Sequence, residues 1–211
     1  MYVLDHPDYA AILIGFFLLV AFPVHELCHA LAAWRLGDGT ARRAGYLTLN
    51  PAKHFHPIGG TFLVLSVLVS GVPLGFAATP VNRANLRGRY AEGAVAAAGP
   101  LSNFAMALGF GLVTRLLAHN PDVVASAPER LWALLGLIVG GNIALGIFNL
   151  LPVPPLDGSA VLLALLPPGT RQRIEPGLAQ YGMLLLLAVF VFGGYVIGPI
   201  TDTLFRALVG Y

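Results

Sequence analysis

The sequence has few charged residues for its size. Asp, Glu, Lys and Arg make up 10% of its 211 residues, whereas soluble domains carry about 25%. Apolar side chains make up 57%, and the mean hydropathy is +0.77. So few charges would not cover a water-facing surface, and such high hydrophobicity excludes a disordered chain. We therefore expect residues 1–211 to form one compact domain embedded in a lipid bilayer.

Cysteine and positive charge are also scarce. The single cysteine, Cys28, excludes a disulfide framework and any zinc site built from several cysteines. The net charge is only +2, and the basic residues lie in short clusters rather than along one face. The sequence therefore predicts no nucleic-acid partner.

Five stretches approach the roughly 20 apolar residues that cross a bilayer. They are residues 9–34, 58–81, 93–114, 131–156 and 176–201. The first contains one carboxylate, Glu26, and the others contain no Asp, Glu, Lys or Arg. The first stretch is predicted to be a retained span rather than a signal peptide, because Asp5 and Asp8 precede it without any Lys or Arg.

Two basic loops determine the predicted topology. They occupy residues 35–57 and 81–92, and basic loops mark the cytoplasmic side. A single crossing by residues 58–81 would place them on opposite sides, and Gly71, Pro73 and Gly75 interrupt a helix there. We therefore predict an all-α polytopic fold with about four transmembrane helices, a re-entrant segment at 58–81 and both termini outside. A plain five-span topology is the alternative.

The first span ends in His25-Glu26-x-x-His29. Helix positions four apart share a face, so both imidazoles can point at one metal ion. In this spacing two histidines bind zinc, and the glutamate acts as general base on a metal-bound water. Ionisable residues in an apolar span are functional candidates. A helix end at the headgroup level is the alternative reading.

A catalytic zinc usually has three protein ligands. Asp157 follows Pro152, Pro154 and Pro155, which interrupt the helix near membrane depth. A carboxylate just after that break can reach the interior, and the zinc site would then lie between helices. The alternative reading is a turn or helix cap at the membrane surface, since an aspartate before glycine suits a turn.

Three motifs, in this order, resemble the site-2 protease family of intramembrane zinc metalloproteases. They are His25-Glu26-x-x-His29, Gly99-Pro100-x-x-Asn103, and Asn149-x-x-Pro152 leading to Leu156-Asp157-Gly158. The resemblance covers about residues 10–165 and is to the short variety without a sensor domain.

The resemblance also implies roles for individual residues. His25, His29 and Asp157 would bind Zn²⁺, and Glu26 would be the catalytic base. Asn149 would lie near the scissile carbonyl. The residues from Gly99 to Asn103 would pack beside the site.

The predicted function is therefore an intramembrane endopeptidase. It would cut membrane-spanning or membrane-anchored proteins near the cytoplasmic side of a prokaryotic plasma membrane. We expect residues 45–82 to supply an edge strand that holds the unwound substrate, with contacts from Val72 and Leu74.

Several polar residues have more than one reading. Asn103 and His54 are further candidate substrate contacts. His54 and His56 are alternatively spare metal ligands or interfacial residues, and Asn103 and Asn142 also suit hydrogen bonds between helices.

Two other functions remain open. One is a small transporter or ion-handling protein, which the absence of a visible internal repeat disfavours. The other is a catalytically silent, protease-like binding protein, although every motif residue needed for catalysis is present.

Overall fold

The computed structural model describes residues 7–75 and 78–210, and within them the regular secondary structure is entirely helical. The elements are α2 (Pro7–Phe16), η1 (Phe17–Ala21), α3 (Phe22–Arg35), α4 (Thr40–Arg43), α5 (Pro51–His54), α6 (Pro57–Ser70), η2 (Arg83–Asn85), α7 (Ala91–Ala118), α8 (Pro121–Ser126), α9 (Glu129–Asn149), α10 (Asp157–Leu165), α11 (Pro168–Phe192) and α12 (Gly194–Val209).

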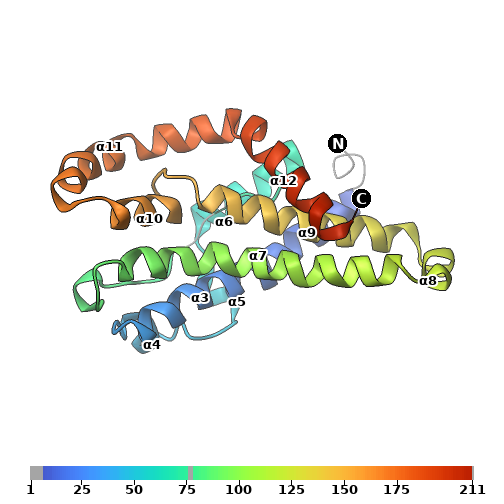
Figure 1. Cartoon of the computed structure of the whole chain (residues 1–211), viewed down its shortest axis with the longest axis horizontal. Coiled ribbons are helices and arrows are strands. Elements are labelled where there is room, and N and C mark those ends of the chain that lie inside the picture. Colours follow the sequence, from blue (N-terminus) through green and yellow to red (C-terminus); the bar gives the residue numbers. More distant parts are fainter. Residues whose placement is uncertain (1–6, 76–77, 211) are drawn as a thin grey trace.

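Four helices are long and apolar enough to cross a membrane. They are Asp8–Arg35, Ala91–Ala118, Glu129–Asn149 and Pro168–Phe192. The first combines α2, η1 and α3 into one rod, in which η1 is a wider π-helical turn just before the histidine motif. All four run roughly along the long axis of the molecule (Figure 1). The prediction of four spans in an all-helical membrane protein is therefore confirmed.

Helix α7 lies at the centre of the arrangement. It packs against α3 on one side and against α9 and α10 on the other (Figure 1). A buried apolar cluster that includes Phe17, Leu63 and Phe148 joins the first span to α6 and α9. The packing places the end of α3, the first half of α7 and the start of α10 side by side.

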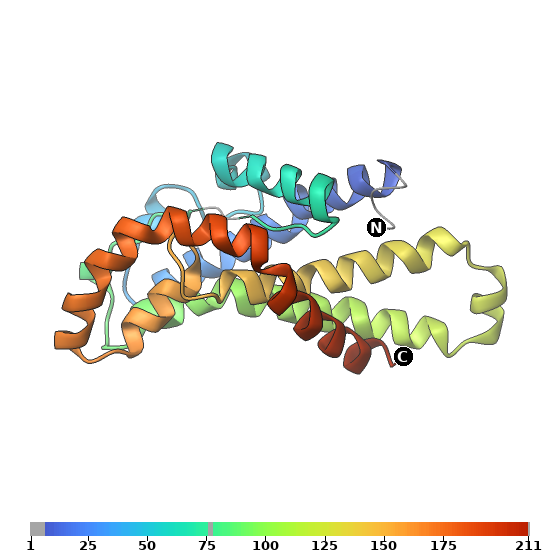
Figure 2. The ribbon, with the colours of Figure 1, turned by 90° about the horizontal axis from the view of Figure 1, so that it is seen from above.

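The segment predicted to re-enter the membrane contains a short helix. Helix α6 has 14 residues, too few to span about 30 Å of hydrocarbon, and it ends at Gly71 in the left-handed conformation. The Ser66 hydroxyl accepts from the Leu74 amide at 2.9 Å, which holds the chain beside α6 after the turn. The chain around α4, before α6, and the chain from η2 to the start of α7 lie at the same end of the molecule (Figure 2), where the Arg87 amide donates to the Leu36 carbonyl at 2.8 Å.

Two predicted helix limits need correction. The stretch 131–156 is helical only to Asn149, because the prolines that follow keep residues 151–156 out of the helix. The span predicted at 176–201 instead begins at Pro168 and ends at Phe192. Pro168 lies in the first turn, where the missing amide costs nothing, and Gly193 separates α11 from α12.

The edge strand predicted within residues 45–82 is wrong for the part of that segment that the structure describes. Those residues form α5, α6 and irregular connections. The apolar run after Pro57 satisfies its backbone hydrogen bonds within a helix and leaves no strand edge to pair with a substrate.

Candidate metal centre

Three side chains from two distant parts of the chain converge beside α7. His25 and His29 lie one turn apart on α3, with their Nε2 atoms 3.0 Å from each other. Oδ2 of Asp157, the first residue of α10, lies 3.1 Å from His25 Nε2 and 3.3 Å from His29 Nε2. Both histidines are buried and the aspartate is partly exposed. Within the described residues this is the one group of three or more side chains suited to hold a metal ion.

The other nitrogen of each imidazole has an acceptor beside it. His29 Nδ1 lies 2.8 Å from the Val95 carbonyl oxygen, and His25 Nδ1 lies 2.7 Å from Asn103 Oδ1. A carbonyl oxygen only accepts, so each Nδ1 carries a hydrogen, and in the neutral imidazole each Nε2 then presents a lone pair. Two lone pairs and a carboxylate oxygen that face one another repel, unless a cation lies between them.

The donor set and its spacing fit zinc. Ligand atoms about 2.1 Å from a tetrahedral zinc ion lie about 3.4 Å from one another, slightly more than the separations above. Gly99 has no side chain and so leaves room for the two imidazoles, since a Cβ at this position would collide with Nε2 of both His25 and His29. His25, His29 and Asp157 would hold the ion, in the usual catalytic combination of three protein ligands.

The proline-rich segment between α9 and α10 determines where Asp157 lies. Gly158 lies so close to the backbone of Leu150 and Leu151 that any side chain at this position would overlap it. The first turn of α10 therefore packs directly against the residues that follow α9. Asp157 is the first residue of α10, but no side-chain capping bond is present there, and its Oδ2 faces both imidazoles instead.

Glu26 lies beside the cluster in a polar cavity. The cavity has a volume of about 260 Å³, and His29, Asp157, Arg83 and Glu92 also line it. Glu26 is 1% exposed, and its Oε2 accepts a hydrogen bond of 2.6 Å from the Thr79 hydroxyl. The carboxylate is thus held in place at the wall of a space large enough for water.

Asn103 and Asn149, two of the other predicted site residues, lie in different settings. Asn103 contacts the cluster directly through His25. Asn149, the last residue of α9, donates one amide hydrogen to the Leu145 carbonyl at 3.1 Å. Its second amide hydrogen is left for another acceptor, so its predicted role near the scissile carbonyl stays a prediction.

The structure does not bring the remaining predicted substrate contacts to the cluster. His54 ends α5, where its Nε2 donates to the Thr48 carbonyl at 2.7 Å, and it lines a separate cavity with Phe55. Val72 and Leu74 line an apolar cavity of about 500 Å³ between α6, α9 and α12. Neither cavity is lined by Glu26 or by the metal cluster.

Two residues near the site were not assigned to it from sequence. Nothing in the sequence distinguishes Thr79 from other threonines, and its contact with Glu26 depends on how the chain returns from α6. Both asparagines were expected to suit hydrogen bonds between helices, and this is confirmed, since Asn103 Nδ2 donates to Asn142 Oδ1 at 3.3 Å. A polar residue within an apolar span was the signal for Asn142, but its connection to His25 was not foreseen.

Comparison with known proteins gives consistent matches. The model of peptidase family M50 matches residues 115–192. YwhC of Bacillus subtilis is 39% identical over 190 residues, which cover 88% of this chain and 84% of YwhC. Rip2 of Mycobacterium tuberculosis H37Rv is 34% identical over 174 residues, which cover 82% of this chain and 64% of Rip2. The curated names of both class them as zinc metalloproteases.

No solved structure gives a significant match to the chain. The sequence relatives are sufficient, because one of them is aligned over most of both chains. Together with the convergent ligand set, they establish that the chain belongs to peptidase family M50, the site-2 protease family of zinc metalloproteases.

Proposed function

We propose that this zinc metalloendopeptidase uses His25, His29 and Asp157 as its zinc ligands and Glu26 as its general base. The observation that carries the proposal is the convergence of two Nε2 lone pairs and a carboxylate oxygen on one point. We further propose that residues 1–211 form a single membrane-embedded protease domain.

The chemistry follows from what each side chain can do in this setting. When bound, zinc would lower the pKa of a coordinated water molecule to near neutrality and would polarise the carbonyl group of a substrate. Glu26, held by Thr79, takes the proton from the attacking water. Asn149 has a free amide hydrogen to donate to the developing oxyanion. The polar cavity supplies the water that hydrocarbon excludes.

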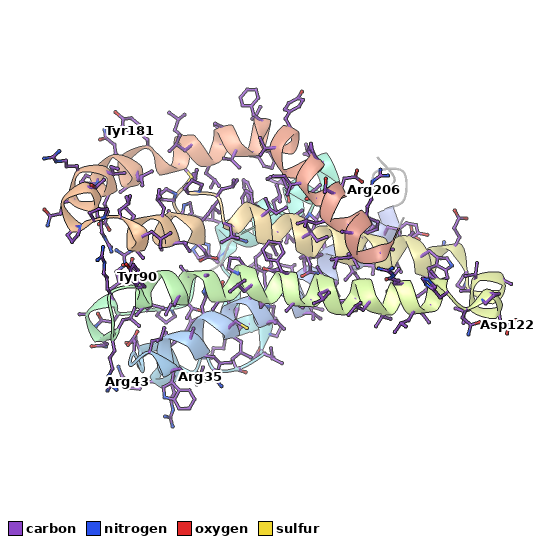
Figure 3. The ribbon with its side chains drawn as sticks, viewed as in Figure 1. Arg35, Arg43, Tyr90, Asp122, Tyr181 and Arg206 are labelled. Atoms are coloured by element: carbon purple, nitrogen blue, oxygen red, sulfur yellow. The ribbon has the colours of Figure 1, made fainter. Side chains whose placement is uncertain are left out.

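The charge distribution supports cleavage near the cytoplasmic side. Arg35 and Arg43 lie at one end of the molecule and Asp122 at the other (Figure 3). The cavity at Glu26 is lined by Arg83, which belongs to the second basic loop. Tyr90, in the same loop, lies at the same end of the molecule as Arg35 (Figure 3). Basic loops remain cytoplasmic. We propose membrane-spanning or membrane-anchored proteins as substrates and, because the relatives are bacterial, a prokaryotic plasma membrane as the location.

The test compares wild type with Glu26→Gln, both purified in detergent. Zinc content is measured by metal analysis, and cleavage is measured on a single-span model substrate. We expect about one zinc per chain in both proteins and a loss of cleavage of at least about 100-fold in the variant, since general base catalysis contributes that much. Glu129→Gln, an exposed glutamate at the opposite end, is the matched control.

Each other outcome contradicts a specific part of the proposal. Cleavage by Glu26→Gln at the wild-type rate would exclude Glu26 as the base. A wild-type protein that binds zinc and cuts nothing would favour a binding protein. Retention of zinc by a His25→Ala, His29→Ala double variant would place the metal elsewhere.

A further inference from the structure

Two asparagines are fully buried in adjacent spans. Asn103 on α7 and Asn142 on α9 are both 0% exposed. An amide group in an apolar interior is costly unless its hydrogen bonds are made. Both amide groups make hydrogen bonds in this structure. Asn103 Nδ2 donates to Asn142 Oδ1, and Asn142 Nδ2 donates to the Ile138 carbonyl at 2.8 Å.

The Ile138 carbonyl sets the direction of this chain of hydrogen bonds. A carbonyl oxygen only accepts, so Asn142 must turn its NH₂ group toward Ile138 and its oxygen toward Asn103. Asn103 then turns its own NH₂ group toward Asn142. Its remaining oxygen faces His25 Nδ1 at 2.7 Å.

The two histidines of the cluster differ in how their tautomers are fixed. His29 Nδ1 faces the backbone carbonyl of Val95, which admits only one hydrogen-bond direction. His25 Nδ1 faces a side-chain amide, and an amide that rotates by 180° offers a donor in place of an acceptor. With the amide reversed, His25 would carry its hydrogen on Nε2, which then has no lone pair for a metal ion.

We propose that Asn142 is a positioning residue of the metal centre, which keeps the Asn103 amide oriented so that His25 presents its Nε2 lone pair. The proposal rests on the proposed function, in that His25 is a zinc ligand. Asn142 touches neither the ion nor the substrate. Partners behind a ligating histidine typically change metal affinity by about 10- to 100-fold when removed.

The first test measures the zinc dissociation constant of the full-length protein in detergent, by competition with a chromogenic chelator. Asn142→Leu should bind zinc about 10-fold more weakly than wild type. Asn142→Asp should stay within about 3-fold of wild type, because a neutral carboxylic acid donates to Ile138 and accepts from Asn103 as the amide does. Thr114→Val removes another buried hydrogen bond of α7, from Thr114 to the Phe110 carbonyl, and should leave the affinity unchanged.

The outcomes distinguish a failure of the role proposed for Asn142 from a failure of the proposed zinc ligands. Wild-type affinity in Asn142→Leu, or equal losses in the Leu and Asp variants, would overturn the role of Asn142. Wild-type affinity in His25→Ala would instead overturn the proposed ligand set.

A second test needs no variant and so does not depend on a variant folding. ¹⁵N NMR of histidine-labelled, zinc-free wild-type protein reports which ring nitrogen carries the hydrogen. We expect His25 in the Nδ1–H form. A predominant Nε2–H form would refute the inference.

Discussion

At the scale of single residues, Gly99 separates α7 from the two imidazoles. Its hydrogen faces Nε2 of His25 and of His29, where a methyl group would overlap both atoms. We expect Gly99→Ala to weaken zinc binding by at least about 10-fold, as loss of correct ligand placement does. The higher helix propensity of alanine, about 1 kcal/mol, should offset part of the cost of this overlap, which is typically about 1–3 kcal/mol. Chelator competition measures the affinity, and thermal unfolding measures the stability.

Gly109 offers a matched control on the same helix. Apart from the neighbouring backbone of its own helix, no atom lies within 4 Å of the position where its Cβ would be. Gly109→Ala should therefore bind zinc like wild type and melt at an equal or slightly higher temperature. Equal zinc affinity in the two alanine variants would show that Gly99 has no particular role at the metal centre.

The sequence was sufficient to predict which site residues lie together when they are close neighbours on one helix. His25 and His29 share a helix face by spacing alone, so their proximity was predictable. The approach of Asp157 was expected from the proline break and the family resemblance. The contact of Thr79 with Glu26 and the connection of Asn142 through Asn103 to His25 were not predictable, because they depend on which faces of separate elements meet.

At the scale of elements, Asp38 joins the end of α3 to the chain that returns from α6. Its carboxylate accepts from the Asn82 amide at 2.6 Å and from the Asn85 side chain at 3.0 Å. It also accepts from the hydroxyl and the amide of Thr40. These bonds hold the segment that carries Thr79 across the cavity.

The hydrogen bonds of Asp38 predict an acid-dependent loss of stability. Burial raises the pKa of this carboxyl, but the bonds from Asn85, Thr40 and Asn82 outweigh burial and lower the pKa from 3.8 to about 2. A group whose pKa is lower in the folded state stabilises the fold above its unfolded pKa. The contribution is lost as the pH falls through the folded value. The loss should therefore occur between about pH 4 and pH 2.

Asp38→Asn tests this interpretation by removing the charge. At pH 5 we expect it to lower the free energy of unfolding by about 2 kcal/mol, typical of a hydrogen bond to a charged group. Thermal unfolding followed by tryptophan fluorescence should show the gap to wild type narrowing as the pH falls to 2. A gap that stays constant over this range would contradict the role assigned to the carboxylate.

Helix limits were predictable where prolines act locally and not where helices bend. The break after Asn149 follows from the missing donors of the proline-rich segment. The division between α11 and α12 at Gly193 was missed because the apolar run continues through it. Hydrophobicity reports burial in lipid and does not report the direction of a helix.

At the scale of the whole molecule, the folded-back course of residues 57–75 and 78–82 decides which loops share a side of the membrane. Labelling of single cysteines in a Cys28→Ala background tests it, with a membrane-impermeant maleimide. Arg43→Cys and Arg89→Cys, at exposed positions in the two basic loops, should react from the same side. Ser126→Cys, exposed in α8 at the other end, should react from the opposite side.

The labelling result also decides between the two topologies considered from the sequence. In a five-span protein, positions 43 and 89 would react from opposite sides. Reaction of position 126 from the same side as position 43 would contradict the four-span arrangement itself.

The sequence separation within the proposed ligand set has a consequence for biosynthesis. His25 and Asp157 are 132 residues apart, so the ribosome delivers the imidazole pair long before the carboxylate. A nascent chain, or a product of premature termination before residue 157, lacks the third ligand. Such products should be unable to hydrolyse neighbouring proteins while they are being inserted. Hydrolytic competence then arises only after α10 has been made and has docked against α7.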